Sequence, residues 1–404
     1  MLSFEQALNI VKEKLAAANL RLGTEAVPLA EACGRVLAED VVADRDYPPF
    51  HRSIRDGFAV RAEDVAALPV ELRSRGEIRA GGHFTGAVGA GECVSIMTGA
   101  PLPTGADAVV MVEYTESQGE RVTIHRGVRS GENVVQQGSE ARAGVGVLPR
   151  GRRLGAGELG LLATVGKSRV PVFVRPVVAI LPTGDEVVPV EQRPEWFQIR
   201  NSNAIALSAQ VVAAGGIPRC LEIAPDRPEA LRSLIQEGLS ADLLLLTGGV
   251  SVGKHDFVEQ VLADLGAAFY FQSVALRPGK PLVFGRVAGK FLFGLPGNPV
   301  STFVTFALFA RPALAALGGG DFAAPLFLRA RLGEPFQQRT GLTAFLPARI
   351  DCSSGDPVAG LVGWQGSGDL VGVAAANCFI VIHPDQTSLA AGDWVDVMRL
   401  SIAD

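Results

Sequence analysis

Between residues 177 and 317 the chain alternates short apolar runs with amphipathic segments, and this pattern restricts the possible folds more than any other feature. The apolar runs begin at Val177, Leu243 and Phe291, and a polar loop that contains glycine follows each of them. Strands that are apolar on both faces are buried on both faces, so helices must cover them. The segment is therefore predicted to form an open, mostly parallel α/β sheet, with helices over 201–214, 228–239, 256–265 and 300–317.

The segments on either side have other patterns. Apolar residues recur at helical spacing over 3–18, where Ser3 and Gln6 form a capping box, and a second, short helical pattern covers 26–43. Residues 44–146 alternate short apolar runs with turn residues, 152–166 are again helical, and short strands fill the chain beyond residue 323. We predict an elongated helical and linker domain (1–43 and 147–174), a β-rich insertion domain (44–146), a central α/β domain (175–322) and a small all-β C-terminal domain (323–404).

The composition excludes several classes of protein. A formal net charge of −5 provides no broad cationic surface for nucleic acid. The longest uncharged run, 291–310, contains Pro296, Gly297 and Pro299, so no helix would cross a bilayer through it. The first residues lack the basic and apolar regions of a secretory signal. Five scattered cysteines form no C-x-x-C pair and are expected to be small buried hydrophobic residues. We predict a cytoplasmic protein that binds neither nucleic acid nor membrane.

Polar side chains gather in the loops after the predicted strands, where ligands bind in open parallel sheets. Asp185 and Glu186 follow the first strand and form the carboxylate pair that a hydrated Mg²⁺ prefers, although an acidic pair in a solvated turn has the same sequence. The loop 247–256 offers exposed amides to a phosphate or another oxyanion. Its candidate residues are Gly248, Gly249, Ser251 and Asp256.

Two further segments carry candidate binding groups. Arg277 and Lys280 lie three residues apart in a turn stiffened by proline and glycine, which suits an oxyanion held in fixed geometry; a solvated turn is the alternative. The loop 295–301 precedes a long apolar helix, and Ser301 at its end is either a ligand or a simple N-cap hydroxyl.

Two motifs match nucleotide-binding signatures by letter only. Residues 248–255 resemble a Walker A loop, but His255 stands where a Ser or Thr hydroxyl must bind Mg²⁺. Residues 155–160 match G-x-G-x-x-G but follow basic residues rather than a buried strand. A P-loop NTPase is therefore not favoured, and 155–160 are interpreted as the start of a helix.

Nine motifs, taken in order, resemble the molybdopterin molybdotransferase family, which includes the bacterial MoeA proteins and the E-domain of gephyrin. They are PPFHRSIRDGFAV from Pro48, MTGAPLP from Met97, GADAVV from Gly105, GENV at 131–134, ILPTGDEV from Ile180, RNSN at 200–203, TGGVSVG from Thr247, RPGKP from Arg277 and LPGNPVS from Leu295. Each motif is weak alone, whereas nine in the family's order are specific and cover nearly the whole chain.

The resemblance implies a late step of molybdenum cofactor synthesis. In this family molybdate is inserted at the dithiolene of adenylated molybdopterin, AMP is released and Mg²⁺ is required. The resemblance also implies a molybdopterin-binding central domain and a homodimer in which the β-rich domain of one subunit reaches the α/β domain of the other. Other proteins of molybdenum cofactor biosynthesis are implied partners. The choice between molybdate and tungstate stays open.

The resemblance also assigns roles to single residues. The resemblance implies catalytic roles for Asp56, Asp256, Arg277 and Lys280, with Asp56 acting across the subunit interface, and Mg²⁺ binding by Asp185, Glu186 and Asp256. Substrate binding is implied for Thr98, Gly248, Gly249, Ser251, Pro296, Gly297, Asn298, Ser301 and Ser367.

The sequence departs from the family at Arg55, Lys254 and Pro347. Pro347 stands where many relatives place an Arg, and Arg349 is a candidate to replace it. Two alternatives therefore stay open. One is a catalytically weakened molybdopterin-binding or scaffold protein of the same fold, and the other is the adenylating activity that a related α/β domain carries.

Overall fold

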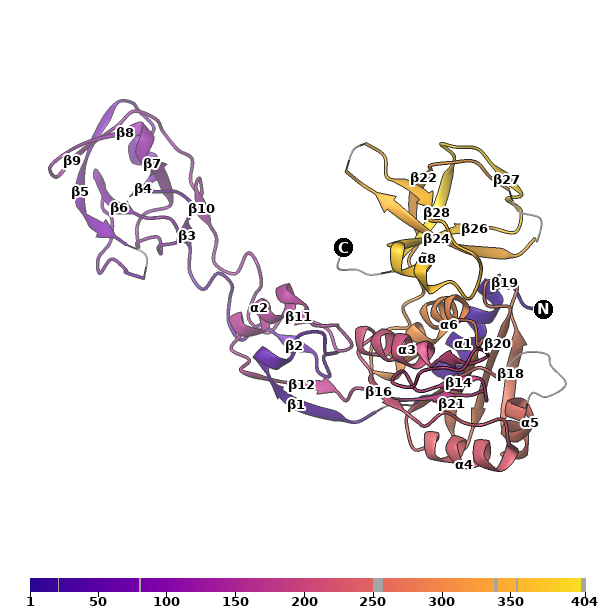
Figure 1. The fold of residues 1–404 in the computed structure, drawn as a ribbon. Helices are drawn as coiled ribbons and strands as arrows, with labels where there is room; N and C mark the ends of the chain where they lie inside the picture. Colours follow the sequence, from indigo (N-terminus) through magenta and orange to yellow (C-terminus); the bar gives the residue numbers. More distant parts are fainter. Residues whose placement is uncertain (21, 80, 250–256, 338–340, 354, 401–404) are drawn as a thin grey trace. The chain divides into compact units, whose positions relative to one another are not determined.

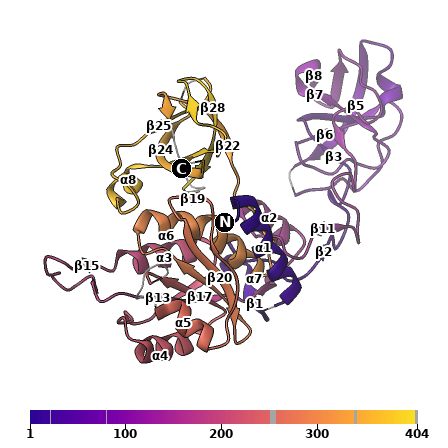
Figure 2. The same cartoon turned by 90° about the vertical axis from the view of Figure 1, so that its right-hand side faces the viewer.

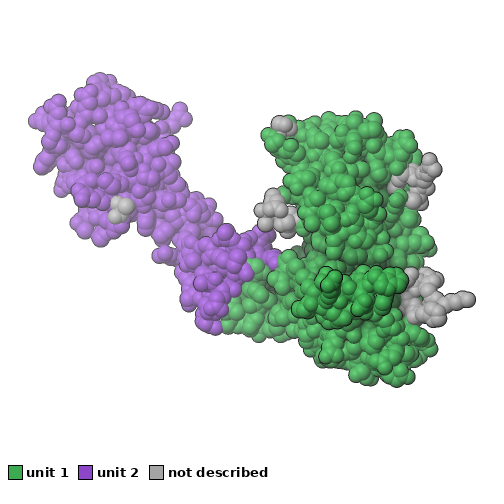
Figure 3. Space-filling view, viewed as in Figure 1, with its two compact units in different colours: residues 1–27, 34–38, 171–404 green, residues 28–33, 39–170 purple. Residues whose placement is uncertain are grey.

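A computed structural model describes residues 1–404 except 21, 80, 250–256, 338–340, 354 and 401–404. The chain forms two compact units (Figure 3). Unit 1 comprises residues 1–27, 34–38 and 171–404, and unit 2 comprises residues 28–33 and 39–170. Unit 1 contains the α/β sheet and the C-terminal strands, and unit 2 contains most of the β-rich N-terminal half.

The central sheet of unit 1 has six strands, and four of them are parallel. Two antiparallel strands complete one edge. In spatial order the strands are β16 (Ile217–Cys220), β13 (Val177–Pro182), β17 (Leu243–Thr247), β21 (Lys290–Leu295), β20 (Pro281–Val287) and β18 (Ala268–Ser273). The predicted open, mostly parallel sheet is confirmed.

Helices cover both faces of this sheet because its central strands are apolar on both faces. Val178 and Ile180 of β13 belong to one core cluster, and the alternating residues Ala179 and Leu181 belong to the other. The first face packs against α1 (Phe4–Ala18), α3 (Ser202–Ala213), α6 (Pro299–Thr305) and α7 (Arg311–Leu317). The second packs against α4 (Pro228–Gly238) and α5 (Phe257–Asp264), and Figures 1 and 2 show both layers.

The apolar helix predicted over 300–317 forms as Pro299–Leu317, with a π-helical turn at Phe306–Ala310 between α6 and α7. Pro312 explains the turn, because proline has no N–H and its ring crowds the carbonyl one turn earlier. The Arg311 N–H instead reaches the Phe306 carbonyl. This segment has the length and hydropathy of a membrane span, yet 78% of it is buried within the protein.

The C-terminal strands of unit 1 form a second six-stranded sheet that closes on itself through the pairing of β24 with β26. Ala330, Ala344 and Ile380 are among the side chains that fill its interior. The strands are β19 (Leu276–Arg277), β24 (Thr343–Asp351), β25 (Val358–Leu361), β22 (Leu328–Leu332), β28 (Trp394–Arg399) and β26 (Cys378–Ile382). A short pair, β23 (Phe336–Gln337) with β27 (Ser388–Leu389), and one helix, α8 (Leu370–Ala375), complete the region.

Unit 2 is built on a six-stranded sheet, as the strand-and-turn pattern of residues 44–146 predicts. Two apolar clusters cover its faces, one around Phe58 and Val110 and the other around Ala59 and Val109. The sheet contains β7 (Ala108–Met111), β4 (Gly57–Val60), β6 (Glu92–Ile96), β5 (Val70–Ile78), β9 (Arg121–Ile124) and β8 (Thr115–Gln118). Smaller pairs join β3 (Arg52–Ser53) to β10 (Val134–Val135) and β2 (Val41–Val42) to β11 (Gly146–Leu148).

The helix predictions for residues 1–166 are confirmed at two places and wrong at a third. The capping box of Ser3 and Gln6 begins α1, and α2 (Ala156–Thr164) starts after Gly155 as expected. The helical pattern over 26–43 is wrong, since that stretch holds the end of β1 (Thr24–Pro28), a single 3₁₀ turn (Leu29–Glu31) and β2. Pairing of β1 with β12 (Arg169–Phe173) keeps β1 extended.

Helix α1 packs in the core of unit 1, where Phe4 contacts the Phe309 and Phe345 rings. The sequence pattern instead predicts that residues 1–43 belong to the linker domain. The boundaries of the four predicted domains stay predictions, because the structure divides the chain into only two compact units. The expected burial of the cysteines is right for Cys93 and Cys378 and wrong for the exposed Cys33, Cys220 and Cys352.

Candidate functional site

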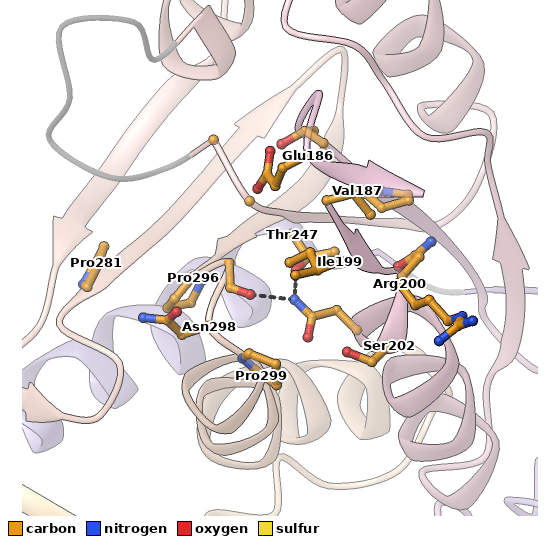
Figure 4. A pocket seen from close by; sticks show the side chains of 17 residues that line it. Glu186, Val187, Ile199, Arg200, Ser202, Thr247, Pro281, Pro296, Asn298 and Pro299 are labelled. Atoms are coloured by element: carbon orange, nitrogen blue, oxygen red, sulfur yellow. Dashed lines mark hydrogen bonds between the residues drawn. The ribbon is translucent and has the colours of Figure 1, made fainter. Parts of the chain in front are cut away.

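A cavity of about 340 Å³ lies at the carboxyl ends of β13, β17 and β21, where backbone groups of parallel strands converge. We call it the glycine-loop cavity (Figure 4). Glu186, Asn298 and Ser202 reach it from three separate elements. Of the predicted site residues it brings together Glu186, Gly248, Gly249, Pro296, Gly297 and Asn298.

Glycine is required at position 248 of this cavity. Gly248 has φ +95°, and a Cβ there would lie 2.6 Å from the Thr183 carbonyl oxygen. A Cβ on Gly297 would lie 3.5 Å from the Cα of Gly248, so the two glycine-containing loops are packed closely together. The sequence prediction that the loop after β17 is shaped by its glycines therefore has a physical basis at Gly248.

Asn203 ties the walls of the glycine-loop cavity to one another. Its side-chain N–H₂ donates to Thr247 Oγ1 at 2.9 Å and to the Gly297 carbonyl at 2.7 Å. Its Oδ1 and the buried hydroxyl of Thr183 are without a hydrogen-bond partner among the described residues. Sequence reasoning assigns no role to either residue, although Thr183 lies in the motif ILPTGDEV and Asn203 in the motif RNSN.

A second cavity, of about 600 Å³, adjoins the first and shares Pro281 and Asn298 with it. We call it the cationic cavity, because Arg277 and Lys280 are the charged residues among the described side chains that line it. It also brings together the predicted residues Ser301 and Ser367. Gln365, two residues before the predicted Ser367 in the same loop, lines it as well, and so does Trp364, for which the sequence offers no signal.

The turn that carries the two cations is fixed against the helix behind it. The Val274 N–H donates to the Lys280 carbonyl at 3.0 Å. Gly279 has φ +113°, and a Cβ there would lie 2.7 Å from Thr305 Cγ2. Both cationic side chains are exposed, so the turn combines a rigid backbone with charges that a ligand can reach.

Ser301 is not the N-cap of the helix that follows the loop 295–301. Asn298 occupies the N-cap position, and Ser301 is a buried residue inside the first turn of α6. The interpretation of Ser301 as a simple N-cap hydroxyl is therefore wrong. Its position on the wall of the cationic cavity is compatible with ligand binding.

The two neighbouring carboxylates predicted to bind Mg²⁺ face different cavities. Glu186 lines the glycine-loop cavity, whereas Asp185 lines a third cavity of about 690 Å³ and accepts a hydrogen bond from the Asp226 N–H at 3.1 Å. Within the described residues no group of three metal-ligating side chains is found. One carboxylate is compatible with Mg²⁺, which is commonly held by one or two carboxylates together with water and substrate phosphates.

In unit 2 the predicted residues Asp56 and Thr98 are joined directly. The Thr98 backbone N–H donates to Asp56 Oδ1 at 2.7 Å, and its hydroxyl donates to the same oxygen at 2.8 Å. These two hydrogen bonds lower the pKa of the Asp56 carboxyl. Gly57 beside it permits a close approach of strands, since a Cβ there would lie 1.9 Å from the Val110 carbonyl oxygen.

The structure does not describe every predicted site residue. Ser251, Asp256 and the departure at Lys254 lie outside the described residues. Pro347 is buried in β24, and the Arg349 guanidinium donates to the Ala375 carbonyl at 3.1 Å. Arg349 is not among the residues that line the cationic cavity. The structure therefore does not support the hypothesis that Arg349 replaces the Arg that many relatives have at position 347.

Models of three protein domains match most of the chain. They are the MoeA N-terminal region (domain I and II) over residues 2–166, the probable molybdopterin binding domain over 179–316 and the MoeA C-terminal region (domain IV) over 329–400. The glycine-loop cavity and the cationic turn both fall within the second match. The class of protein is thus one built around a molybdopterin-binding α/β domain.

Whole-chain relatives narrow this class to one family. The molybdopterin molybdenumtransferase of Staphylococcus epidermidis is 34% identical over 98% of this chain and 95% of its own length. That of Bacillus subtilis is 36% identical over 93% of this chain and 90% of its own length. A crystal structure of the molybdopterin biosynthesis MoeA protein from Pyrococcus horikoshii superposes with a TM-score of 0.81, 29% identity and coverage of 99% and 100%. The chain belongs to the MoeA family of molybdopterin molybdenumtransferases, which act in molybdenum cofactor biosynthesis.

Proposed function

We propose that this chain inserts molybdenum from molybdate into adenylated molybdopterin and releases AMP, with Mg²⁺ as the required ion. The observation that carries the proposal is the pair of adjoining cavities, the first of which lies at the carboxyl ends of β13, β17 and β21. One is walled by two loops that contain glycine, and the other has two cations and no carboxylate among its described lining residues. Such a pair suits a substrate phosphate beside a separate oxyanion.

In this proposal the glycine-loop cavity holds the phosphates of the adenylated substrate. The backbone of Gly248 and Gly249 can approach the phosphates closely because neither residue has a side chain. Pro296, Gly297 and Asn298 form the opposite wall, and Asn298 lies between the two cavities. Ser251 and Asp256 of the same loop are proposed to complete this site.

The cationic cavity is proposed to hold molybdate. Arg277 offers a planar set of N–H donors and Lys280 a compact ammonium, so together they bind an oxyanion from two directions. Ser301 and Ser367 are proposed to contribute hydroxyl groups from the cavity wall. Molybdate in this cavity would lie beside a ligand in the adjoining cavity, as transfer of the metal requires.

The residues present fit a Mg²⁺ ion in part. Glu186 supplies one carboxylate to the glycine-loop cavity, and we propose Asp256 as the second ligand. Asp185 is proposed as a more distant carboxylate, because its hydrogen bond to Asp226 turns it to the neighbouring cavity. A bound Mg²⁺ would withdraw negative charge from the phosphates and favour the departure of AMP.

The active form is proposed to be a cytoplasmic homodimer. Asp56 of one subunit, fixed by Thr98, would act at the cavities of the other subunit. Other proteins of molybdenum cofactor biosynthesis are proposed partners for the delivery of substrate and removal of product. The negative net charge supports the exclusion of nucleic acid as a ligand.

The experiment that tests this function measures AMP release from adenylated molybdopterin by the purified protein. Reactions contain Mg²⁺, with and without molybdate, and the product is used to reconstitute a molybdenum enzyme. Release of AMP that depends on molybdate, together with reconstitution, is the expected result. Substrate binding without release of AMP at any molybdate concentration would contradict the proposal. It would favour the alternative of a catalytically weakened binding protein, which the buried Pro347 in place of an Arg also supports.

A further inference from the structure

The loop at residues 364–368 forms one wall of the cationic cavity, and it belongs to the C-terminal region rather than to the α/β sheet. Trp364, Gln365, Gly366 and Ser367 all line the cavity. The loop contains no secondary structure of its own and precedes α8. A wall without helix or strand needs other interactions to keep its donors in place.

Asp369 supplies such interactions at the end of the loop. Its Oδ2 accepts the Gln365 N–H at 2.9 Å, and its Oδ1 accepts the Gly372 N–H at 3.1 Å. Its own N–H donates to the Gly366 carbonyl at 3.1 Å. One carboxylate therefore joins the start of the loop to the first turn of α8.

A second contact fixes the middle of the loop to the opposite side of the cavity. The Ser367 carbonyl accepts the Val300 N–H at 2.9 Å, and Val300 lies between Asn298 and Ser301, which also line the cavity. The start of the loop packs closely against α8, since a Cβ on Gly372 would lie 2.8 Å from the Trp364 Cβ. The hydroxyl and amide of Ser367 have no partner among the described residues and are left for a ligand.

We propose that Asp369 is a positioning residue of the cationic cavity: by holding Gln365 and Gly372 it keeps the 364–368 loop in the conformation that binds an oxyanion. Asp369 does not line the cavity itself and acts through the loop. The backbone N–H groups of Gln365 and Gly372 lower its pKa, so that it is a carboxylate at neutral pH and accepts both hydrogen bonds. This inference rests on the proposed role of the cavity in binding molybdate.

Two substitutions separate positioning from folding. Asp369→Asn keeps the shape of the side chain but loses the charge and leaves only one acceptor oxygen. Asp369→Ser keeps a hydroxyl that can cap α8, as serine commonly does, and releases Gln365. Asp351→Asn is the matched control, because Asp351 also accepts a backbone N–H, from Ser353 at 2.8 Å, and lines neither cavity.

The measurement is the equilibrium binding of molybdate, followed by the fluorescence of Trp364 in a W196F/W394F background. Calorimetry of AMP binding is the second readout, since AMP is proposed to occupy the glycine-loop cavity. We expect both Asp369 variants to bind molybdate about tenfold more weakly, the size of effect typical for loss of a hydrogen bond to a charged group, with AMP binding unchanged. Asp351→Asn is expected to match the parent protein in both measurements.

Three outcomes contradict the inference in different ways. Molybdate binding by both variants at the parent affinity would show that the loop does not need Asp369. Parallel loss of molybdate and AMP binding would show that Asp369 supports the fold as a whole. If the parent protein itself binds no molybdate, the proposed function of the cavity fails first, and the inference fails with it.

Discussion

At the level of single residues, the affinity of the cationic cavity for an oxyanion depends on Arg277 and Lys280. Both are exposed, so their charges are hydrated before a ligand arrives, and binding must replace that hydration with direct hydrogen bonds. The rigid turn reduces the cost, because Gly279 and the Val274–Lys280 hydrogen bond already fix the backbone.

Lys280→Ala is expected to weaken molybdate saturation far more than it weakens the fold. Loss of a charge-assisted hydrogen bond costs about 1.5–3 kcal/mol, so the half-saturating molybdate concentration should rise about tenfold to a hundredfold. The free energy of unfolding should change little, since the side chain is exposed. Titration of AMP release with molybdate measures the first quantity and urea denaturation the second. Lys12→Ala on the exposed side of α1 is the control, and unchanged saturation in Lys280→Ala would remove Lys280 from the site.

Thr98→Val is expected to raise the pKa of Asp56 towards its ordinary value of about 3.9. A carboxyl whose pKa is lowered by folding stabilises the protein above the unfolded pKa, and this stabilisation is lost as the pH falls through the folded value. The valine variant should therefore lose the Asp56 carboxylate at a higher pH, while both proteins carry it at neutral pH. Titration of the Asp56 carboxyl by NMR measures the shift. Thr115→Val, whose hydroxyl donates to Val112, is the control, and an equal midpoint for Thr98→Val would contradict the expectation.

At the level of elements, aromatic rings join α1 to the rest of unit 1. The Phe4 ring lies 5.7 Å from that of Phe309, 6.2 Å from that of Phe327 and 6.0 Å from that of Phe345. These partners come from the π-helical turn, the chain before β22, and β24 of the closed sheet. The N-terminal helix thus bridges the α/β core and the C-terminal strands.

Phe4→Ala is expected to destabilise unit 1 by about 3–5 kcal/mol, since the ring is buried and its removal leaves a cavity between three elements. Chemical denaturation measures the loss. The exposed Glu13 of the same helix provides the control variant Glu13→Ala, for which a change below about 0.5 kcal/mol is expected. An equal effect of both substitutions would mean that α1 is not held by this aromatic contact.

The elements show how far sequence reasoning reaches. Strands β13, β17 and β21 could be predicted because apolar runs bounded by turn residues specify buried strands. The position of α1 could not, since an amphipathic helix reveals its apolar face but not the surface that covers it. Ser367 is implied by the family resemblance, whereas the neighbouring Trp364 could not be predicted, because this loop reaches the cavity only through the fold of a distant region. Asp185 and Glu186 are adjacent in sequence, and only the backbone turn decides that they face different cavities.

At the level of the whole molecule, the candidate residues are divided between the two units. Asp56 and Thr98 belong to unit 2, whereas the residues that line both cavities belong to unit 1. A chemical step that needs both sets requires that the units meet, within one subunit or across a dimer. The proposed homodimer places Asp56 of one subunit at the cavities of the other.

Heterodimers of two inactive variants distinguish these arrangements. A dimer of Asp56→Asn with Lys280→Ala, purified through two different tags, has one fully intact site if the site is shared between subunits. It should therefore recover about half of the wild-type activity per dimer, as follows from two equivalent sites in a symmetric dimer. The matched control joins the double variant D56N/K280A to a wild-type subunit and should be almost inactive, because each shared site then carries one substitution. If the control is half active and the first heterodimer inactive, Asp56 acts within its own subunit. AMP release measures activity, and light scattering confirms that each preparation is a dimer.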